Sequence, residues 1–384
     1  MMGGKCVLLV ATATKWLAAA RMPSAQSRAG FEVALLAPRG SLAEKSRYLA
    51  KVGYLADNAT PLDWVYAFAA MVKATSPSLV VPCDDTAVRL LHMLALSPPL
   101  GIKPGIHGEL CALVRESLGN PEYFHTSVDK TRLPAAAEAL GVRIPPYAIA
   151  ASVDEAQAFA AIRGYPVVLK RSHGAAGEWV AIVSDPIELA RTYERFAAAK
   201  AIDFEGRGNA NILVQAHVVG KIFSQTMTAW QGTVLAGFVR EKLVTHSPFG
   251  PATVVRCVRM PEIRRFSDQL AIGLGMSGFF GLEYIVDAGT GEAYLLEINR
   301  RAMPSTPLGG MIDIDLCAAL YAAVNGQPPS GRRDLDPGEE HMITHFPQEW
   351  LRDPQSRYLR DFRIDAPWDD PEVMEAMLAL RNDA

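Results

Sequence analysis

The sequence predicts a protein of the α/β (α+β) class, in which a small parallel α/β unit is followed by further strands and helices. Three observations predict it. Apolar runs of strand length alternate with helix-like segments over residues 6–96, which is typical of a parallel sheet. Strands with alternating side chains then recur over residues 224–258. Residues 278–301 have the pattern of two apolar strands around a glycine-containing turn, which indicates a β-hairpin.

The composition is that of an ordinary globular protein. Of its 384 residues, 49% are hydrophobic and 21% are charged, so the chain has enough apolar surface for two or three packed subdomains. A formal net charge of −3 gives no electrostatic reason to expect nucleic acid or a membrane as a partner. The five cysteines are odd in number and widely spaced, which favours reduced thiols over disulfides or a zinc cluster.

Two features could suggest export or a membrane, and the sequence argues against both. Lys5 precedes an apolar run as in a signal peptide, but Lys15 and Trp16 interrupt that run, and residues 6–10 have the length of a buried strand. No stretch approaches the ~18–20 unbroken apolar residues that a membrane-spanning helix needs. We therefore expect a cytoplasmic protein.

The N-terminal unit is expected to be a small parallel sheet with helices between its strands. Its apolar runs cover residues 6–11, 31–37 and 78–82. No Gly-x-Gly-x-x-Gly follows the first run, which argues against a dinucleotide site. Asp84 and Asp85 follow the third run at the edge where open sheets bind ligands, although capping of the next helix is the favoured role for one of them.

Two lysines stand at distinctive positions in the middle of the chain. Asp129-Lys130 is expected to open a helix that runs to about Leu140. Lys170 follows the strand 166–169 and begins a loop of small residues, 170–178, in which backbone N–H groups can approach phosphate oxygens closely. An ordinary hairpin turn explains this loop about as well, and it is not a Walker A loop because Gly-x-x-x-x-Gly-Lys-Ser/Thr is absent.

The hairpin carries the residues that point most directly to chemistry. Glu297 and Asn299 lie two residues apart and therefore share a face of their strand. If the strands pair about Thr290, Glu283 lands opposite Glu297 on that face, where two like charges are unfavourable without a partner. Two carboxylates and an amide oxygen suit a hard divalent cation such as Mg²⁺, although solvated acids on a surface hairpin remain the alternative.

The hairpin also resembles a known segment. Glu-Tyr-Ile-Val-Asp, a short turn and Leu-Leu-Glu-Ile-Asn-Arg-Arg are similar to the metal-binding segment of ATP-grasp enzymes, and the resemblance extends from about residue 105 to 326. It implies an ATP-grasp fold of two α+β subdomains behind the N-terminal domain. It also implies that Glu283, Glu297 and Asn299 hold magnesium, or manganese in its place, against ATP.

The same resemblance implies a set of nucleotide contacts. The residues it assigns to ATP are Lys130, Lys170, Ser172, Gly174, Gly177, Gln215, Ala216 and Val218. The two lysines would contact the phosphates, the small-residue loop would close over the nucleotide, and the backbone at Ala216 and Val218 would read adenine. The sequence departs from the family where Lys221 and Ile222 replace a frequent acidic ribose partner, so the ribose contact is open and Gln215 is a weak candidate for it.

Several basic residues are candidates for the substrate side of the site. Arg240 and Lys242 share a strand face and could meet an anion together, with a solvated strand face as the equal alternative. Arg301 matches an arginine of the family by position, where it would steady the transferred phosphoryl group. The catalytic candidates are Arg301, Lys242 and Arg256. Arg300 replaces a proline that is frequent in the family, and residues 245–252 would form a substrate rim.

The chain is expected to divide into five parts. They are an N-terminal α/β domain (1–104), a linker with central helices (105–146), a small ATP-grasp subdomain (147–215), a large subdomain with the metal site (216–330) and a C-terminal arm (331–384). The arm is expected to pack along the body and to end in a helix over 372–380. No chemistry is assigned to it, because His341 and His345 have a metal-pair spacing but Pro347 follows and the glutamate of a His-Glu-x-x-His site is absent.

The leading functional hypothesis is an ATP-dependent ligase. It would activate a carboxylate as an acyl phosphate and join it to an amine or a thiol, releasing ADP and phosphate. Its partners would be small molecules, and a homodimer is compatible with the sequence. One alternative is a carboxylase of the same fold that activates bicarbonate, and another is an ATP-binding module without turnover.

Overall fold

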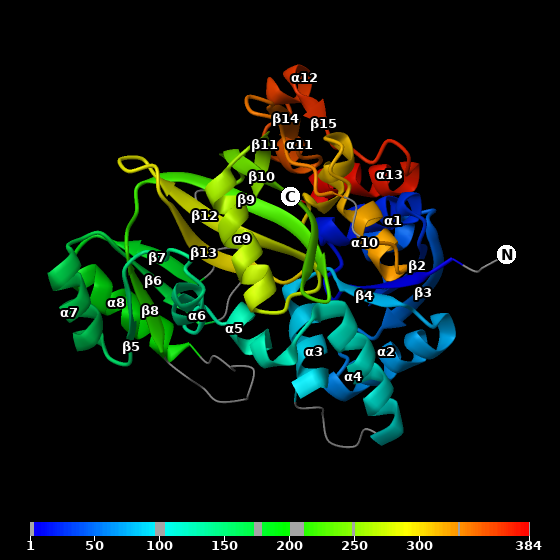
Figure 1. Ribbon diagram of the computed structural model, residues 1–384, viewed down its shortest axis with the longest axis horizontal. Helices are drawn as coiled ribbons and strands as arrows, with labels where there is room; N and C mark the ends of the chain where they lie inside the picture. Colours follow the sequence, from blue (N-terminus) through cyan, green and yellow to red (C-terminus); the bar gives the residue numbers. More distant parts are fainter. Residues whose placement is uncertain are drawn as a thin grey trace.

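The computed structural model describes residues 4–96, 104–172, 179–199, 211–247, 250–328 and 331–383. Within them the chain forms three sheets, of four, seven and four strands. Figure 1 shows the seven-stranded sheet between the N-terminal unit, in blue, and the smaller four-stranded sheet, in green. No helix among the described residues is long and apolar enough to cross a membrane.

The N-terminal sheet is parallel, with the strand order β3-β2-β1-β4, as the sequence predicted. Its strands are β1 (Cys6–Val10), β2 (Glu32–Pro38), β3 (Leu49–Leu55) and β4 (Leu79–Pro82), and its helices are α1 (Leu17–Ala29), α2 (Pro61–Thr75), α3 (Asp85–Leu96) and α4 (Pro104–Leu118). Alternate residues of β1 enter two different cores: Leu9 packs with α1, and Leu8 packs with α2 to α4. The strand β3 was not predicted from the sequence. It is a half-exposed edge strand that carries Lys51 and Gly53, so it lacks the apolar run that marks the other strands of this sheet.

The small sheet is antiparallel, in the order β5-β8-β6-β7, and one of its faces is covered by two helices. Its elements are β5 (Tyr147–Ala150), α7 (Val153–Arg163), β6 (Val167–Arg171), β7 (Val180–Val183), α8 (Pro186–Ala198) and β8 (Ile212–Ala216). Asp185 caps α8 by accepting hydrogen bonds from the backbone N–H groups of Ile187 and Glu188. Lys170 and Gln215 lie on the opposite face of the sheet. Lys170 pairs with Leu213, and Gln215 pairs with Val168, and paired residues point to the same side.

Two short helices lead into the small sheet, α5 (Phe124–Val128) and α6 (Leu133–Ala139). The sequence analysis was wrong about where the second one starts. Asp129 and Lys130 precede it in a turn, because Asp129 Oδ1 accepts from the backbone N–H of Thr131 at 2.8 Å and so competes with helix formation. The change places Lys130 on a turn, outside the hydrogen-bond ladder of the helix.

The large sheet has the order β13-β12-β9-β10-β11-β14-β15. Its strands are β9 (Gly220–Trp230), β10 (Thr233–Thr245), β11 (Ala252–Val258), β12 (Gly278–Asp287), β13 (Ala293–Asn299), β14 (His341–Thr344) and β15 (Arg363–Ile364). Helix α9 (Pro261–Gly273) packs on one face, which we call the helix face, over a core that includes Met227 and Tyr284. The other face carries Glu283 and is called the site face. The N-terminal unit and α10 (Leu316–Val324) pack against part of it.

The C-terminal arm packs against both the large sheet and the N-terminal unit. Its strands β14 and β15 extend the large sheet at the β11 edge, and its helices are α11 (Gln348–Arg352), α12 (Tyr358–Asp361) and α13 (Pro371–Ala379). Val373 and Met377 of α13 pack against Ala20 and Leu42 of the N-terminal unit. Figure 1 shows α13, in red, beside the blue α1, so the predicted packing of the arm along the body is confirmed.

Candidate functional site

The acidic residues of the hairpin lie side by side on the site face. β12 and β13 pair so that Glu283 stands opposite Glu297, which confirms the register predicted from a turn about Thr290. Glu283 forms an ion pair with Lys242 of β10, and Glu297 lies 3.9 Å from the ammonium nitrogen of Lys130. Cations from other segments thus offset the repulsion between two facing carboxylates.

The two lysines of the central segment converge on this acidic pair. The amide of Lys130 donates to the carbonyl of Ser172 at 2.9 Å, which ties the turn before α6 to the end of β6. Lys170 lies near the end of that strand and is only 7% exposed. Burial and the charge of Lys130 together lower its pKa to about 8, although Glu297 acts to raise it. Two crowded ammonium groups beside the carboxylates favour the binding of a polyanion.

Glu297 is held as a carboxylate. Burial acts to raise its pKa, but Lys130, a hydrogen bond from Asn299 and two further lysines outweigh burial and bring the pKa below its ordinary value. Asn299 Nδ2 donates to Glu297 Oε1 at 3.1 Å, so the two side chains are locked together. The arrangement keeps an anionic oxygen pair in a fixed place.

The oxygen donors of the hairpin fit a magnesium ion. Among the described residues, no three His, Cys, Asp or Glu side chains gather into one group, so the site is no closed protein cage. Magnesium commonly takes one or two carboxylates from a protein and keeps its other positions for water and substrate phosphates. Glu283, Glu297 and the amide oxygen of Asn299 are such a partial donor set.

Arg301 connects the hairpin with the N-terminal unit. Its Nε donates to Asp85 Oδ1 at 2.9 Å, and its Nη2 donates to Asn299 Oδ1 at 3.3 Å. Its guanidinium carbon also lies 5.0 Å from the ring centre of Trp16. Asp84, in contrast, caps α3 at the amide of Ala87, which confirms the capping role for one of the two aspartates.

Arg300 has a structural position. Its guanidinium donates to the carbonyl of Leu118 at the end of α4, and it lies 5.8 Å from the ring centre of Phe280. Burial lowers its pKa to about 9. The residue that replaces the family proline therefore braces the end of β13 against α4, and it leaves Arg301 on the site.

Arg240 and Lys242 share the site face, as expected from their spacing. Arg240 is buried, and its Nε donates to Thr226 Oγ1 at 3.4 Å, while Lys242 pairs with Glu283. The structure does not bring Arg256 to them. The register of β10 and β11 sets Arg256 opposite Glu241 on the helix face, where its Nε donates to Glu241 Oε2 at 3.1 Å. The geometry therefore corrects the grouping of Arg256 with the catalytic candidates.

The strand expected to read the nucleobase is β8, which lies between β5 and β6 in the small sheet. Gln215 is buried beside Lys170 on the same face, and its Oε1 accepts no hydrogen bond from any described residue. The amide of Ala216 is already bonded to the carbonyl of Pro146 at 2.8 Å, while Val218 lies beyond the end of β8. Of the predicted loop over the nucleotide, Gly174 and Gly177 lie outside the described residues, as do residues 248 and 249 of the predicted rim.

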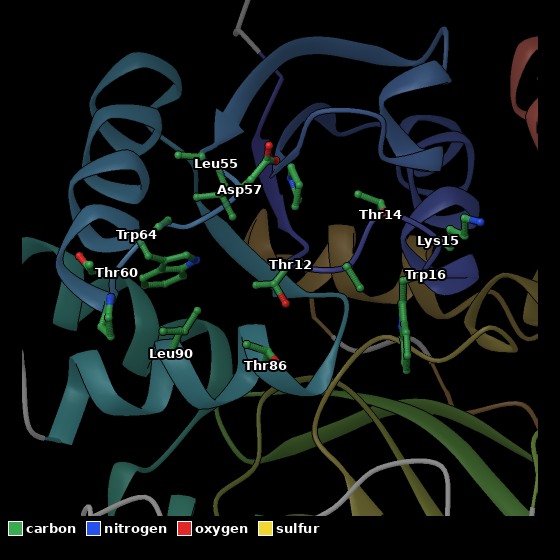
Figure 2. A pocket seen from close by; sticks show the side chains of 15 residues that line it. Thr12, Thr14, Lys15, Trp16, Leu55, Asp57, Thr60, Trp64, Thr86 and Leu90 are labelled. Atoms are coloured by element: carbon green, nitrogen blue, oxygen red, sulfur yellow. The ribbon is translucent and has the colours of Figure 1, made fainter. Parts of the chain in front are cut away.

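Two hollows adjoin the acidic pair and Arg301. A cavity of about 70 Å³ lies over the site face, and its lining includes Arg240, Lys242, Glu283, Asn299, His345 and Gln348. A cleft of about 700 Å³ opens at the carboxyl edge of the N-terminal sheet, where Thr12, Asp57, Trp64 and Leu90 are among the residues that line it (Figure 2). Trp16 lines this cleft and also contacts the guanidinium of Arg301, so one side chain lies between the cleft and the site.

Three contributors to the site were missed or undervalued in the sequence. Asp85 was only a weak candidate, because its partner Arg301 is far away along the chain. Trp16 was noted only as an interruption of an apolar run. His345 was considered only as a metal ligand with His341, whereas the structure pairs His341 with Glu339 and His345 with Asp365. The pairs Asp85–Arg301 and His345–Asp365 join residues that are far apart in the sequence, so no local pattern predicts them.

Residues 129–324 match a family model described as the ATP-binding domain of the carbamoyl-phosphate synthase L chain. A carbamoyl phosphate synthase large chain of Thermus thermophilus is 28% identical over 301 residues, which are 70% of this chain and 28% of that protein. The corresponding chain of Methanospirillum hungatei is 29% identical over 195 residues, 49% of this chain and 18% of that protein. The matched part of the chain thus spans 28% and 18% of the length of these two relatives.

Solved structures with a similar fold are also known. The biotin carboxylase domain of Hydrogenobacter thermophilus 2-oxoglutarate carboxylase, solved as a dimer with MgADP, ADP and bicarbonate, has a TM-score of 0.66 at 19% identity, covering 86% of this chain and 72% of that one. N5-carboxyaminoimidazole synthetase from Staphylococcus aureus, solved with ADP, has a TM-score of 0.59 at 14% identity, covering 85% and 79%. At these identities the likeness shows the fold alone, and it confirms the predicted ATP-grasp architecture.

Proposed function

Because the chain belongs to the family of carbamoyl-phosphate synthase L chain ATP-binding domains, we propose that it is an ATP-dependent ligase that forms ADP. In the proposed reaction a carboxylate oxygen attacks the γ-phosphorus of ATP, ADP leaves, and an amine then displaces phosphate from the acyl phosphate. One observation carries the proposal: Lys130, Lys170 and Lys242, from three separate segments, converge on the facing pair Glu283 and Glu297.

Each group has a role in this reaction. Magnesium, held by Glu283, Glu297 and Asn299, would neutralise phosphate oxygens. Lys130 and Lys170 would contact the phosphates, because their like charges are crowded together beside the metal-binding oxygens. Arg301 would steady the phosphoryl group in transfer, since Asp85 and Asn299 fix the direction of its guanidinium. Manganese is the alternative ion.

The remaining nucleotide contacts complete the proposal. The nucleobase would lie along the end of β8, with the backbone at Ala216 and Val218 as its reader. Gln215 is the proposed ribose contact, because its oxygen is unpartnered within the described residues and it shares a face with Lys170. Ser172, Gly174 and Gly177 remain predicted contacts of the phosphates. The division of residues 105–330 into linker, small subdomain and large subdomain also remains a prediction.

Small molecules are the proposed partners. The cleft of about 700 Å³ has room for the body of an organic substrate, whose reacting group would reach Arg301 past Trp16. A homodimer is part of the proposal, since the Hydrogenobacter protein was solved as a dimer. All five cysteines are buried and free, which supports the predicted cytoplasmic location.

A second candidate reaction is the activation of bicarbonate in place of an organic acid. The cavity of about 70 Å³ beside Lys242 and Arg240 has room for only about two water-sized groups. Such a space suits a carboxyl group alone, and bicarbonate is little more than that. In both reactions the acid would be phosphorylated and then transferred to an amine.

The experiment is a Mg²⁺-dependent assay of ADP release over pooled amino acids, other carboxylates, bicarbonate and amines. Glu297→Ala is expected to lose turnover by about 10²-fold or more, because it removes half of the carboxylate pair. Glu292→Ala is the matched control, since this residue lies in the same hairpin but pairs with Arg143 away from the site. Release that needs an organic acid supports the ligase, whereas release that needs bicarbonate supports the second reaction. Equal rates for the wild type and Glu297→Ala would contradict both.

A further inference from the structure

The C-terminal arm reaches into the candidate site, although it lies outside the residues that match the family model. His345 follows β14, which pairs with β11 at the edge of the large sheet, and the amide of His345 donates to the carbonyl of Thr253 at 2.8 Å. His345 and Gln348 line the same cavity of about 70 Å³ as Lys242 and Glu283. A histidine is therefore placed within the proposed reaction space by the arm.

The ring of His345 is held in one orientation. Its Nδ1 lies 3.1 Å from Asp365 Oδ2, and the pair is buried, with His345 2% and Asp365 3% exposed. Asp365 Oδ1 also accepts from the amide of Phe346 at 2.7 Å and lies 3.4 Å from Arg21 of α1. Burial acts to raise the pKa of Asp365, but Arg21 and His345 outweigh it and bring that pKa below its ordinary value.

The orientation decides which ring nitrogen is available. Because Asp365 is a carboxylate, it can only accept, so Nδ1 of His345 carries a proton and donates it. The structure gives the ring no other hydrogen-bond partner among the described residues, so Nε2 remains for a group in the cavity, and in the neutral ring this nitrogen is the acceptor. Gln348 Oε1 also has no hydrogen-bond partner within the described chain, so a second acceptor lines the same space.

The chemistry of the second half-reaction requires such acceptors. An amine is protonated at neutral pH, and it must lose that proton before its lone pair can attack an acyl carbon. The other charged groups that face the cavity are Arg240 and Lys242, which are cations, and Glu283, which pairs with Lys242 and would hold the metal. Glu349 of α11 is engaged with Thr253 and Arg352 instead.

We propose that His345 is the proton acceptor for the attacking amine, with Gln348 accepting a second N–H and Asp365 as its positioning residue. The inference rests on the proposed function and applies to both candidate acids. The amine nitrogen forms the new C–N bond, the bond from the acyl carbon to the phosphate oxygen breaks, and phosphate leaves with that electron pair. The ammonium proton passes to Nε2 of His345 before the attack, and the second proton, which the nitrogen loses as the amide forms, passes to the departing phosphate.

The test compares two acceptors in full-length protein with MgATP and the pooled carboxylates and bicarbonate. Pooled amino acids with ammonium are charged at neutral pH, whereas hydroxylamine is largely uncharged and traps an acyl phosphate without a base. His345→Gln is expected to keep ADP release with hydroxylamine within about twofold and to lose release with the charged amines by about 10²-fold. Raising the pH should partly restore ADP release by His345→Gln with the charged amines, because it increases the fraction of free amine.

Two further variants sharpen the result. His341→Gln is the matched control, since His341 begins β14 just before His345, pairs with Glu339 and does not line the cavity; it should match the wild type with both acceptors. Asp365→Asn should show the same selective loss as His345→Gln, because it removes the group that fixes the tautomer.

Each remaining outcome is decisive. A His345→Gln variant as active as the wild type with charged amines overturns the inference alone, and so does an equal loss with both acceptors. A wild type that releases no ADP with either acceptor overturns the proposed function, and this inference with it.

Discussion

The two faces of the large sheet both carry charged side chains but treat them differently. On the helix face, Glu241 is 3% exposed and accepts from Arg256, and it also pairs with Lys221 at 3.0 Å. Its pKa is below the ordinary value because these partners outweigh the effect of burial. Arg256 also pairs with Glu340 at 3.2 Å, so two cations meet two carboxylates, as in a structural ion-pair network.

On the site face, cations outnumber the acids that they contact. Lys130, Lys170 and Lys242 surround Glu283 and Glu297, and buried Arg240 stands behind them. The pKa of Lys170 falls because burial and the charge of Lys130 outweigh the two acids. The comparison teaches that balanced pairs mark a structural face, whereas a crowded cationic surplus beside carboxylates marks a face built for an anion and a metal.

The largest expected effect comes from Lys170→Met. We expect ADP release to fall by about 10²–10³-fold with the fold intact, because a donor to the transferred phosphate is lost while the burial cost of an ammonium disappears. The variant should therefore have a lower turnover rate but a higher thermal unfolding temperature than the wild type. A variant that keeps wild-type turnover would break the assignment of the site face.

Arg301→Lys should have the next largest effect. Lysine keeps the charge but cannot bond Asp85 and Asn299 together in the planar geometry of a guanidinium. We expect kcat to fall by about 10-fold or more, with the Kd of ATP nearly unchanged. Steady-state kinetics and ATP titration measure the two separately. A weakened Kd with normal kcat would instead make Arg301 a nucleotide contact.

Arg256→Met tests the helix face. We expect a loss of stability of about 2 kcal/mol, because buried Glu241 keeps only Lys221 as a partner. The kcat should stay within about twofold of the wild type in conditions where the variant is folded. Urea unfolding and turnover provide the measurements. A selective loss of kcat would reverse the conclusion that Arg256 lies apart from the site.

The smallest expected effect is a proton taken up when nucleotide binds. Burial lowers the pKa of Lys170 to about 8, so near pH 8 about half of the free protein carries this amine uncharged. Phosphate oxygens favour the ammonium and raise that pKa, so binding takes up to about half a proton at pH 8 and less below pH 7. Calorimetry in buffers of different ionisation enthalpy reports the sign. Proton release, or uptake unchanged in Lys170→Met, would contradict the mechanism.

Much of the architecture could be predicted because it depends on local patterns. The hairpin followed from two apolar strands around one turn, and Glu283 stands opposite Glu297 as predicted, although an irregularity between Glu283 and Tyr284 that the sequence did not predict contributes to this register. The parallel N-terminal sheet followed from buried runs such as β1. Residues that are close together in the sequence are enough to specify such features.

Other parts of the site depend on contacts that no local pattern encodes. The face of Arg256 is set by the register of β10 and β11, in which two irregularities between Lys242 and Thr245 offset each other, and no local pattern encodes them. Asp85 and His345 come to the site from the N-terminal unit and the C-terminal arm. Their roles follow only from packing between distant parts of the chain.

The central claim is that the facing carboxylates hold a metal ion against a nucleotide bound by the lysines. Calorimetric titration of ATP, with and without Mg²⁺, into the wild type and Glu297→Gln tests it most directly, because no substrate needs to be known. We predict that Mg²⁺ strengthens ATP binding by about 10-fold or more in the wild type and hardly at all in Glu297→Gln. An equal strengthening by Mg²⁺ in both proteins would contradict the claim.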